Sequence, residues 1–114
     1  MSDCLFCKII KQEIPSEKVY ENDNVYAFKD IYPQAKEHYL FISKSHTTNL
    51  NELVDNANDL QNIFQAIKEF TEKQTDLAKN GFRVVTNHGK HGCQTVFHTH
   101  FHVLGGEQLG SFGK

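Results

Sequence analysis

The chain has 114 residues, of which 39% are hydrophobic and 11% aromatic, enough for one compact core and too few for two. We therefore expect one domain over residues 1–114. The formal net charge of -2 argues against nucleic-acid or membrane surfaces as partners, because both attract basic proteins. No basic patch precedes an apolar run at the N-terminus, and no segment approaches the ~20 apolar residues of a membrane span. We expect a cytoplasmic protein.

Cysteine and histidine counts give a first chemical clue. The chain has three cysteines and seven histidines, and five of the histidines lie between His88 and His102. An odd number of cysteines makes a disulfide framework a poor interpretation in this setting, so metal binding or inert burial is favoured.

The first half of the chain predicts a short helix and three strands. The helix covers residues 4–11 and ends before Ile14-Pro15, since proline restricts the residue before it. Brief strands are expected at 19–21 and 25–30, separated by the turn-forming residues 22–24. The next strand, 38–43, has an apolar centre, as in a strand covered on both faces.

The spacing of apolar residues changes in the middle of the chain. Apolar residues recur at spacings of three and four, with one longer gap, which predicts one long amphipathic helix. Asp55 or Asn58 is its expected N-cap, and Asn80-Gly81 its C-terminal stop. The apolar stripe consists of Leu60, Ile63, Phe64, Ile67, Phe70 and Leu77.

The last third predicts two strands around a polar loop. The strands cover 82–86 and 96–104, and the loop covers 87–95. The order of elements predicts an α+β fold, in which an antiparallel sheet of about five strands carries the long helix on one face and the short N-terminal helix completes the domain.

The sequence QTVFHTHFHVL, residues 94–104, carries the strongest chemical signal. Side chains alternate along a strand, so His98, His100 and His102 are predicted to share one face. Three adjacent imidazoles make a poor core and a good site. The alternative is an exposed strand with chance histidines, or a simple metal binder. The intervening residues Thr99, Phe101 and Val103 are expected to face the core.

The run HTHFHVL resembles the His-φ-His-φ-His-φ-φ signature of the histidine-triad superfamily of nucleotide hydrolases and transferases. The longer run QTVFHTHFHVLGG resembles the branch of histidine-triad nucleotide-binding (Hint) proteins. The similarity covers nearly the whole chain, with further matches at CLFCKIIKQEIPSEKVYE, AFKDIYPQAKEH and KSH.

This resemblance implies a division of catalytic roles. It makes the central histidine, His100, the nucleophile, which forms a covalent nucleotidyl-histidine. The backbone carbonyl of His98 would fix its tautomer. His102 would donate to the phosphate oxygens, His38 would support the triad, and Thr95 would lie near the leaving group.

The resemblance also implies a nucleotide site. Asp30 would bind the ribose hydroxyls, with Phe28 and Ile31 beside the base, and Asn87 would reach the sugar or phosphate. The loop that contains Cys93 and Gln94 would offer backbone amides to the phosphate.

Four residues depart from the family pattern, which bears on substrate preference more than on the reaction. Cys93 stands where Gly is usual, and Thr99 stands where a hydrophobic residue is usual. Tyr32 and Lys36 replace a small residue and Pro near the base pocket.

Cys4 and Cys7 have C-x-x-C spacing, which lets two thiolates hold one ion. Alone, such a pair is equally compatible with structural or redox thiols. By resemblance to zinc-containing bacterial relatives, His46 and His98 would complete a tetrahedral site. The zinc would be structural, and no catalytic divalent cation is expected.

The favoured function is hydrolysis of purine nucleoside 5′-phosphoramidates or related conjugates, releasing a nucleoside monophosphate. The enzymatic alternatives are dinucleoside polyphosphate hydrolysis and nucleotidyl transfer. The others are a nucleotide-binding scaffold with incidental turnover and a zinc-stabilised interaction module. Relatives form two-fold dimers that extend the sheet, so a homodimer is expected.

Overall fold

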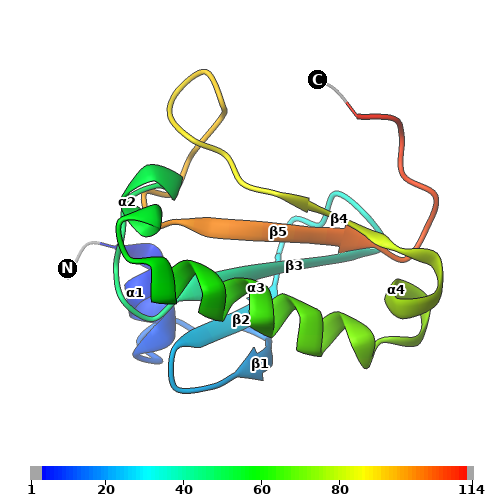
Figure 1. Ribbon diagram of the computed structural model, residues 1–114, viewed down its shortest axis with the longest axis horizontal. Helices are drawn as coiled ribbons and strands as arrows, with labels where there is room; N and C mark the ends of the chain where they lie inside the picture. The colour runs from blue at the N-terminus through cyan, green and yellow to red at the C-terminus, as the bar shows by residue number, and fades with distance from the viewer. Residues whose placement is uncertain (1–3, 113–114) are drawn as a thin grey trace.

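The computed structural model describes residues 4–112 and has one five-stranded antiparallel sheet in the order β1-β2-β3-β5-β4 (Figure 1). This confirms the predicted α+β class. The strands are β1 (Lys18–Glu21), β2 (Val25–Lys29), β3 (Glu37–Ser43), β4 (Phe82–Val85) and β5 (His100–Gly105). The helices are α1 (Leu5–Ile10), α2 (Leu50–Val54), α3 (Ala57–Glu72) and α4 (Thr75–Asn80). None of the helices in the described part is long and apolar enough to cross a membrane.

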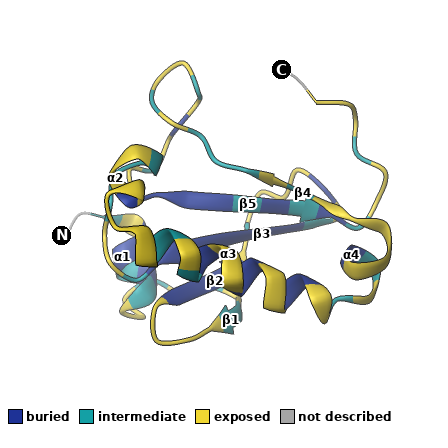
Figure 2. Cartoon of the chain, in the orientation of Figure 1, coloured by how far each residue is buried: buried dark blue, intermediate teal, exposed yellow. Residues whose placement is uncertain are grey.

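The sheet buries both of its faces. Alternate residues of the central strands, such as Phe41 and Phe101, pack against α3 in the larger core cluster. The residues between them, such as Leu40 and Ile42, face the other way and pack against α1. Figure 2 shows β3 as buried along nearly its whole length, while the outer side of α3 is exposed. The apolar run predicted for 38–43 is explained by this double cover.

The loop between β1 and β2 confirms the predicted turn. The Asn22 side-chain oxygen accepts hydrogen bonds from the backbone N–H groups of Asn24 and Val25, both at 2.8 Å. This short polar side chain takes the place of a backbone acceptor, which is why asparagine is common in turns.

The long helix predicted for the middle of the chain is present as α3 but is shorter than predicted, because the chain breaks before α4, and the short helix α2 precedes it. Asn49 caps α2 by accepting from the Glu52 N–H at 3.1 Å. Asn56, not Asp55 or Asn58, is the N-cap residue of α3. The chain turns at 73–74, where the apolar stripe has its longer gap, and α4 then carries Leu77 into the core. The predicted stop is confirmed, since Gly81 ends α4 with φ 96°.

The last strand is shorter than predicted. It begins at His100, and residues 96–98 form a bend. Ile42 is the last residue of β3 that pairs with β5, opposite His100. The Thr99 N–H instead donates to the Thr47 carbonyl at 2.8 Å, outside the sheet. Only His100 and His102 therefore share a strand face, and His98 precedes the strand.

Candidate functional site

A cavity of about 440 Å³ lies between α1 and the sheet face that carries the paired histidines. It collects most of the residues singled out from the sequence. Asn87, Cys93 and Gln94 are not among its lining residues. The predicted site residues that line it are Phe28, Asp30, Ile31, His38, Thr95, His100 and His102.

His100 has its two ring nitrogens in different roles. Its Nδ1 lies 2.8 Å from the backbone carbonyl oxygen of His98. A carbonyl can only accept, so Nδ1 carries the hydrogen and Nε2 keeps its lone pair. The residue is 6% exposed, and burial lowers its pKa. His100 is therefore a neutral imidazole with Nε2 free to act as a nucleophile near pH 7.

His102 is held in the opposite tautomer by a chain of hydrogen bonds. The Gln34 backbone N–H donates to His38 Nδ1 at 3.0 Å, so the hydrogen of His38 must be on Nε2. His38 Nε2 lies 2.8 Å from His102 Nδ1, to which it donates. His102 Nδ1 is thus an acceptor, and its hydrogen is on Nε2. On the cavity side, the histidines of β5 therefore present one lone pair, on His100, and one N–H donor, on His102.

Burial keeps this chain neutral. It lowers the pKa of His102 to about 4, with the neighbouring His100 and His38 acting in the same direction. Burial also lowers the pKa of His38, although the Asp30 carboxylate opposes the shift. Both imidazoles are therefore uncharged near pH 7, as the tautomer assignment requires.

Asp30 joins the histidine chain from the cavity wall. Its Oδ2 lies 3.5 Å from His38 Nε2, and its Oδ1 accepts from the Tyr32 N–H at 2.8 Å. Asp30, His38 and His102 are close enough to hold a metal ion. However, a metal on His38 Nε2 would displace its hydrogen to Nδ1, where it would face the Gln34 N–H. We therefore interpret this cluster as a hydrogen-bond chain.

The loop before β5 is held by its own side chains. The Gln94 amide donates to the Thr48 carbonyl at 2.6 Å, and its oxygen accepts from the Gly89 N–H at 2.9 Å. The Asn87 amide donates to the Gly92 carbonyl at 2.7 Å. These two side chains shape the loop from within, and Thr95 is the loop residue that reaches the cavity.

A second cluster brings together the four residues predicted to hold zinc. The ligand atoms of Cys4, Cys7, His46 and His98 all lie within 4.8 Å of one another. His98 Nδ1 is 3.4 Å from Cys4 Sγ and 3.6 Å from Cys7 Sγ. Cys7 Sγ is 3.4 Å from His46 Nδ1.

These separations fit a tetrahedral zinc ion. Bonds of about 2.3 Å to sulfur and about 2.0 Å to nitrogen at tetrahedral angles give an S···N distance of about 3.5 Å. The other nitrogen of His98, Nε2, donates to the Ser43 carbonyl at 2.9 Å, so Nδ1 keeps the lone pair that a metal needs. The donor set is closed, as in structural zinc sites.

The apolar wall contributed by α1 was missed in the sequence. Phe6 packs edge-on against His100, with ring centroids 5.1 Å apart, and against Phe28 at 5.5 Å. Phe6 and Ile9 both line the cavity. Their i, i+3 spacing was the signal available, because it places both on one side of a helix.

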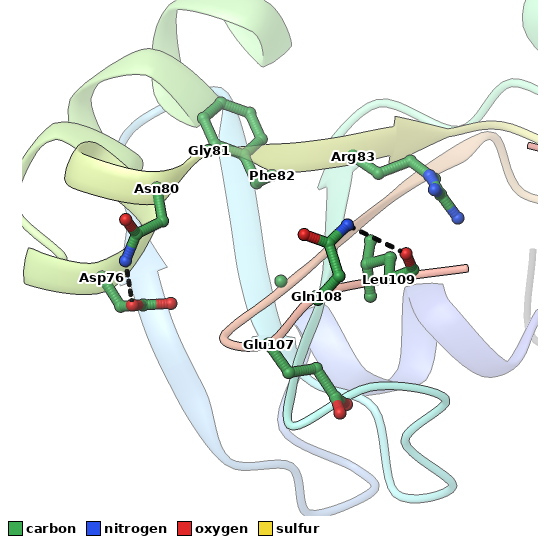
Figure 3. Close-up of a pocket in the computed structure, with 9 residues that line it drawn as sticks. Asp76, Asn80, Gly81, Phe82, Arg83, Glu107, Gln108 and Leu109 are labelled. Atoms are coloured by element: carbon green, nitrogen blue, oxygen red, sulfur yellow. Dashed lines mark hydrogen bonds between the residues drawn. The ribbon is translucent and has the colours of Figure 1, made fainter. Parts of the chain in front are cut away.

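A second cavity of about 440 Å³ lies where α4, the start of β4 and the segment after β5 meet (Figure 3). Its polar groups are already paired locally, since the Asn80 amide donates to Asp76 at 2.6 Å. None of the residues that line it is a histidine or a cysteine. It therefore lacks the nucleophile and the donor found beside α1.

The comparisons with known proteins identify the family of the chain. The family model described as HIT domain matches residues 11–109. A 14 kDa zinc-binding protein of Zea mays is 43% identical over 110 residues, which cover 95% of this chain and 85% of the relative. The adenylylsulfatase HINT1 of Arabidopsis thaliana is 42% identical over 110 residues, covering 95% and 74%.

A solved structure shows the same fold. The HIT family hydrolase from Clostridium thermocellum matches with a TM-score of 0.91 and 43% identity, over 98% of this chain and 97% of that one. The triad geometry, the extent of the family match and these identities together show that the chain belongs to the HIT domain family, in its Hint-like branch, and is a hydrolase.

Proposed function

We propose that the protein hydrolyses purine nucleoside 5′-phosphoramidates or related nucleotide conjugates and releases a nucleoside monophosphate. The observation that carries this proposal is the pair of opposite tautomers on β5. His100 offers a lone pair, and His102 offers an N–H two residues along the same strand face. A nucleophile beside a donor is the arrangement that substitution at a phosphate diester or amide requires.

The reaction has two steps. In the first, His100 Nε2 attacks the α-phosphorus, the P–N bond breaks, and the amine leaves with a proton taken from solvent. In the second, water attacks the phosphorus, the P–Nε2 bond breaks, and a proton returns to solvent. The His98 carbonyl stabilises the positive charge that the substituted His100 ring carries, through the Nδ1–H bond of 2.8 Å. His102 and Thr95 supply donors to the phosphate, and no divalent cation is required.

The nucleoside occupies the apolar part of the cavity. Phe28 and Ile31 lie beside the base, and Asp30 accepts from the ribose hydroxyls with the oxygen that it does not use on the Tyr32 N–H. Phe6 adds to the apolar wall between the base and His100. The contribution of Asn87, Cys93 and Gln94 is to hold the phosphate loop in shape, since the Cys93 and Gln94 N–H groups donate to the Lys90 and Gly89 carbonyls within the loop.

The role of zinc in this proposal is structural. An ion held by Cys4, Cys7, His46 and His98 would cross-link α1, the segment after β3 and the segment before β5. When bound, it supplies rigidity, because all four positions are taken by protein ligands. The atom that orients His100 is the carbonyl of His98, while the ring nitrogen of the same residue faces the metal site.

We further propose that two copies associate through β4. This strand is an edge of the described sheet, and its Phe82 and Val84 side chains are 41% and 40% exposed. Edge strands with apolar side chains are open to pairing with another chain. A two-fold axis beside β4 would extend the sheet into the second copy.

The test is a panel of nucleotide conjugates with wild-type, His100→Ala and His91→Ala proteins. Adenosine phosphoramidates should be cleaved, and His100→Ala should lower kcat/KM by roughly 10³-fold or more, since the nucleophile is gone. The exposed loop residue His91 serves as the histidine control and should leave the rate unchanged. The same panel includes adenylyl sulfate and dinucleoside polyphosphates, and faster cleavage of either would favour that hydrolase activity over phosphoramidate hydrolysis. Wild-type turnover by His100→Ala would refute the assignment.

A further inference from the structure

The bend that carries His98 is held in place by a pair of threonines. This segment lies outside the sheet, so the ladder of β5 does not fix it. Thr99 Oγ1 lies 2.7 Å from Thr47 Oγ1 and 3.2 Å from the Thr47 carbonyl oxygen. The Thr99 backbone N–H donates to the same carbonyl at 2.8 Å. Three hydrogen bonds therefore join two residues that are 52 positions apart.

The position of each threonine in the chain gives this contact its significance. Thr47 follows His46, and Thr99 lies between His98 and His100. The contact thus connects the segment with one candidate metal ligand to the segment with another. It also fixes the residue that follows the His98 carbonyl, which accepts from His100 Nδ1.

Burial makes the hydroxyl of Thr99 costly unless it is bonded. Thr99 is 2% exposed, and an unpartnered buried hydroxyl is destabilising. Its hydroxyl has both an acceptor, the Thr47 carbonyl, and a second hydroxyl within reach. A hydrophobic residue at position 99 could pack there but could not make these bonds.

We propose that Thr47 and Thr99 form a hydroxyl clip that preassembles the metal site and the nucleophile. The clip holds the His46 and His98 segments in register before any ion binds, and keeps the His98 carbonyl directed at His100. Both threonines are positioning residues, since neither lines the catalytic cavity. The inference rests on the proposed function for its catalytic part, and on the donor set alone for its metal part.

The first test is zinc affinity, measured by competition with a chelator. Thr99→Val and Thr47→Val each remove one hydroxyl and nearly preserve side-chain volume. One hydrogen bond corresponds to about a fivefold change in an equilibrium constant, so each variant should bind zinc about fivefold more weakly. The double variant should lose little more than either single variant, because the two hydroxyls act as one unit.

The matched control is Thr71→Val. Thr71 is 3% exposed, and its hydroxyl donates to the Ile67 carbonyl at 2.7 Å within α3, remote from both sites. It should lower Tm as the clip variants do, but leave zinc affinity and kcat unchanged. Thr99→Ser keeps the hydroxyl and should restore zinc affinity to within twofold of wild type.

The second test needs neither zinc nor substrate. In metal-free protein, the Thr99 amide should exchange with solvent about fivefold faster in Thr47→Val than in wild type. Neither residue 98 nor residue 99 changes in this variant, so intrinsic exchange is constant. The proposal is overturned if this rate and zinc affinity stay within twofold of wild type, or if Thr71→Val alters both equally. Failure of catalysis in the wild type would refute the proposed function, and failure of zinc binding would refute the proposed metal site, while the exchange result still decides the clip.

Discussion

Replacing Cys93 by glycine should stabilise the protein. Cys93 has φ 64°, in the left-handed region that residues with a Cβ rarely adopt. Its backbone N–H donates to the Lys90 carbonyl at 3.1 Å, and the Gln94 N–H donates to the Gly89 carbonyl at 3.0 Å. This pair of hydrogen bonds requires a left-handed residue at position 93. The same backbone angle explains why the histidine-triad pattern usually has glycine at this position.

The magnitude follows from two opposing contributions. A residue with a Cβ in the left-handed region costs about 1–2 kcal/mol. A glycine makes the unfolded chain more flexible, and the loss of this freedom on folding costs about 0.5–1 kcal/mol. The net effect of Cys93→Gly is therefore a gain of about 0.5–1 kcal/mol in the free energy of unfolding.

Urea unfolding measures this gain directly. With an m-value of about 2 kcal/mol/M, the midpoint should rise by about 0.3–0.5 M at constant m. Two controls separate backbone conformation from side-chain chemistry. Cys93→Ala removes the thiol but keeps the Cβ, and should not stabilise. Gly89 has φ 75° and open space around its missing Cβ, so Gly89→Ala should destabilise by about 1 kcal/mol.

The reasoning is refuted if Cys93→Ala stabilises as much as Cys93→Gly, because the thiol and not the backbone would then be responsible. It is also refuted if Gly89→Ala leaves the urea midpoint unchanged. A Cβ at position 89 would meet no neighbouring atom, so the left-handed backbone angle is the source of strain that this variant tests.

Three further predictions concern the loop, the histidines and the metal. Gly92→Ala should abolish turnover, because its Cβ would lie 2.5 Å from the His88 carbonyl oxygen; a variant with wild-type kcat/KM contradicts this. Burial lowers the pKa of His102 from its ordinary value of 6.5 to about 4. Between these pH values the unfolded state binds more protons than the folded state, so the free energy of unfolding declines as pH falls through that window. Urea midpoints measured at pH 7, 6 and 5 should therefore depend less on pH in His102→Gln than in wild type. Cys4→Ser should lower the zinc content of purified protein, and unchanged stoichiometry by metal analysis would exclude the four-ligand site.

Most of the fold was predictable because hydrophobic periodicity reports burial. The centre of β3 around Phe41 is apolar, and the sheet is covered on both faces there. Periodicity failed where the chain changes direction without losing its pattern. Leu77 is in register with the stripe on α3, although the helix breaks before it. His98 likewise continues the alternation of β5, while its segment bonds to a loop carbonyl.

Most of the residues that line the cavity beside α1 could be predicted from the sequence, whereas the tautomers of its histidines could not be derived from the residues. The triad spacing placed His100 and His102 on one face, and the structure does so. Their tautomers depend on which backbone atom lies opposite each ring, a carbonyl at His98 and an amide at Gln34. Side-chain identity carries no information on these main-chain contacts, so the residues alone do not distinguish the lone pair from the donor, and only the resemblance to the histidine-triad family implied these roles.

The main-chain contacts of these histidines limit how the sequences of the family can diverge. Main-chain atoms fix the tautomers of His100 and His102, and most substitutions leave these atoms unchanged. The contact to His38 uses only the backbone N–H of Gln34, so proline is excluded at this position because it has no N–H to donate. A substitution at His98 can remove a ring from the metal site and still retain the carbonyl that orients His100. Metal binding can therefore be lost in a lineage while the tautomer of His100 is retained.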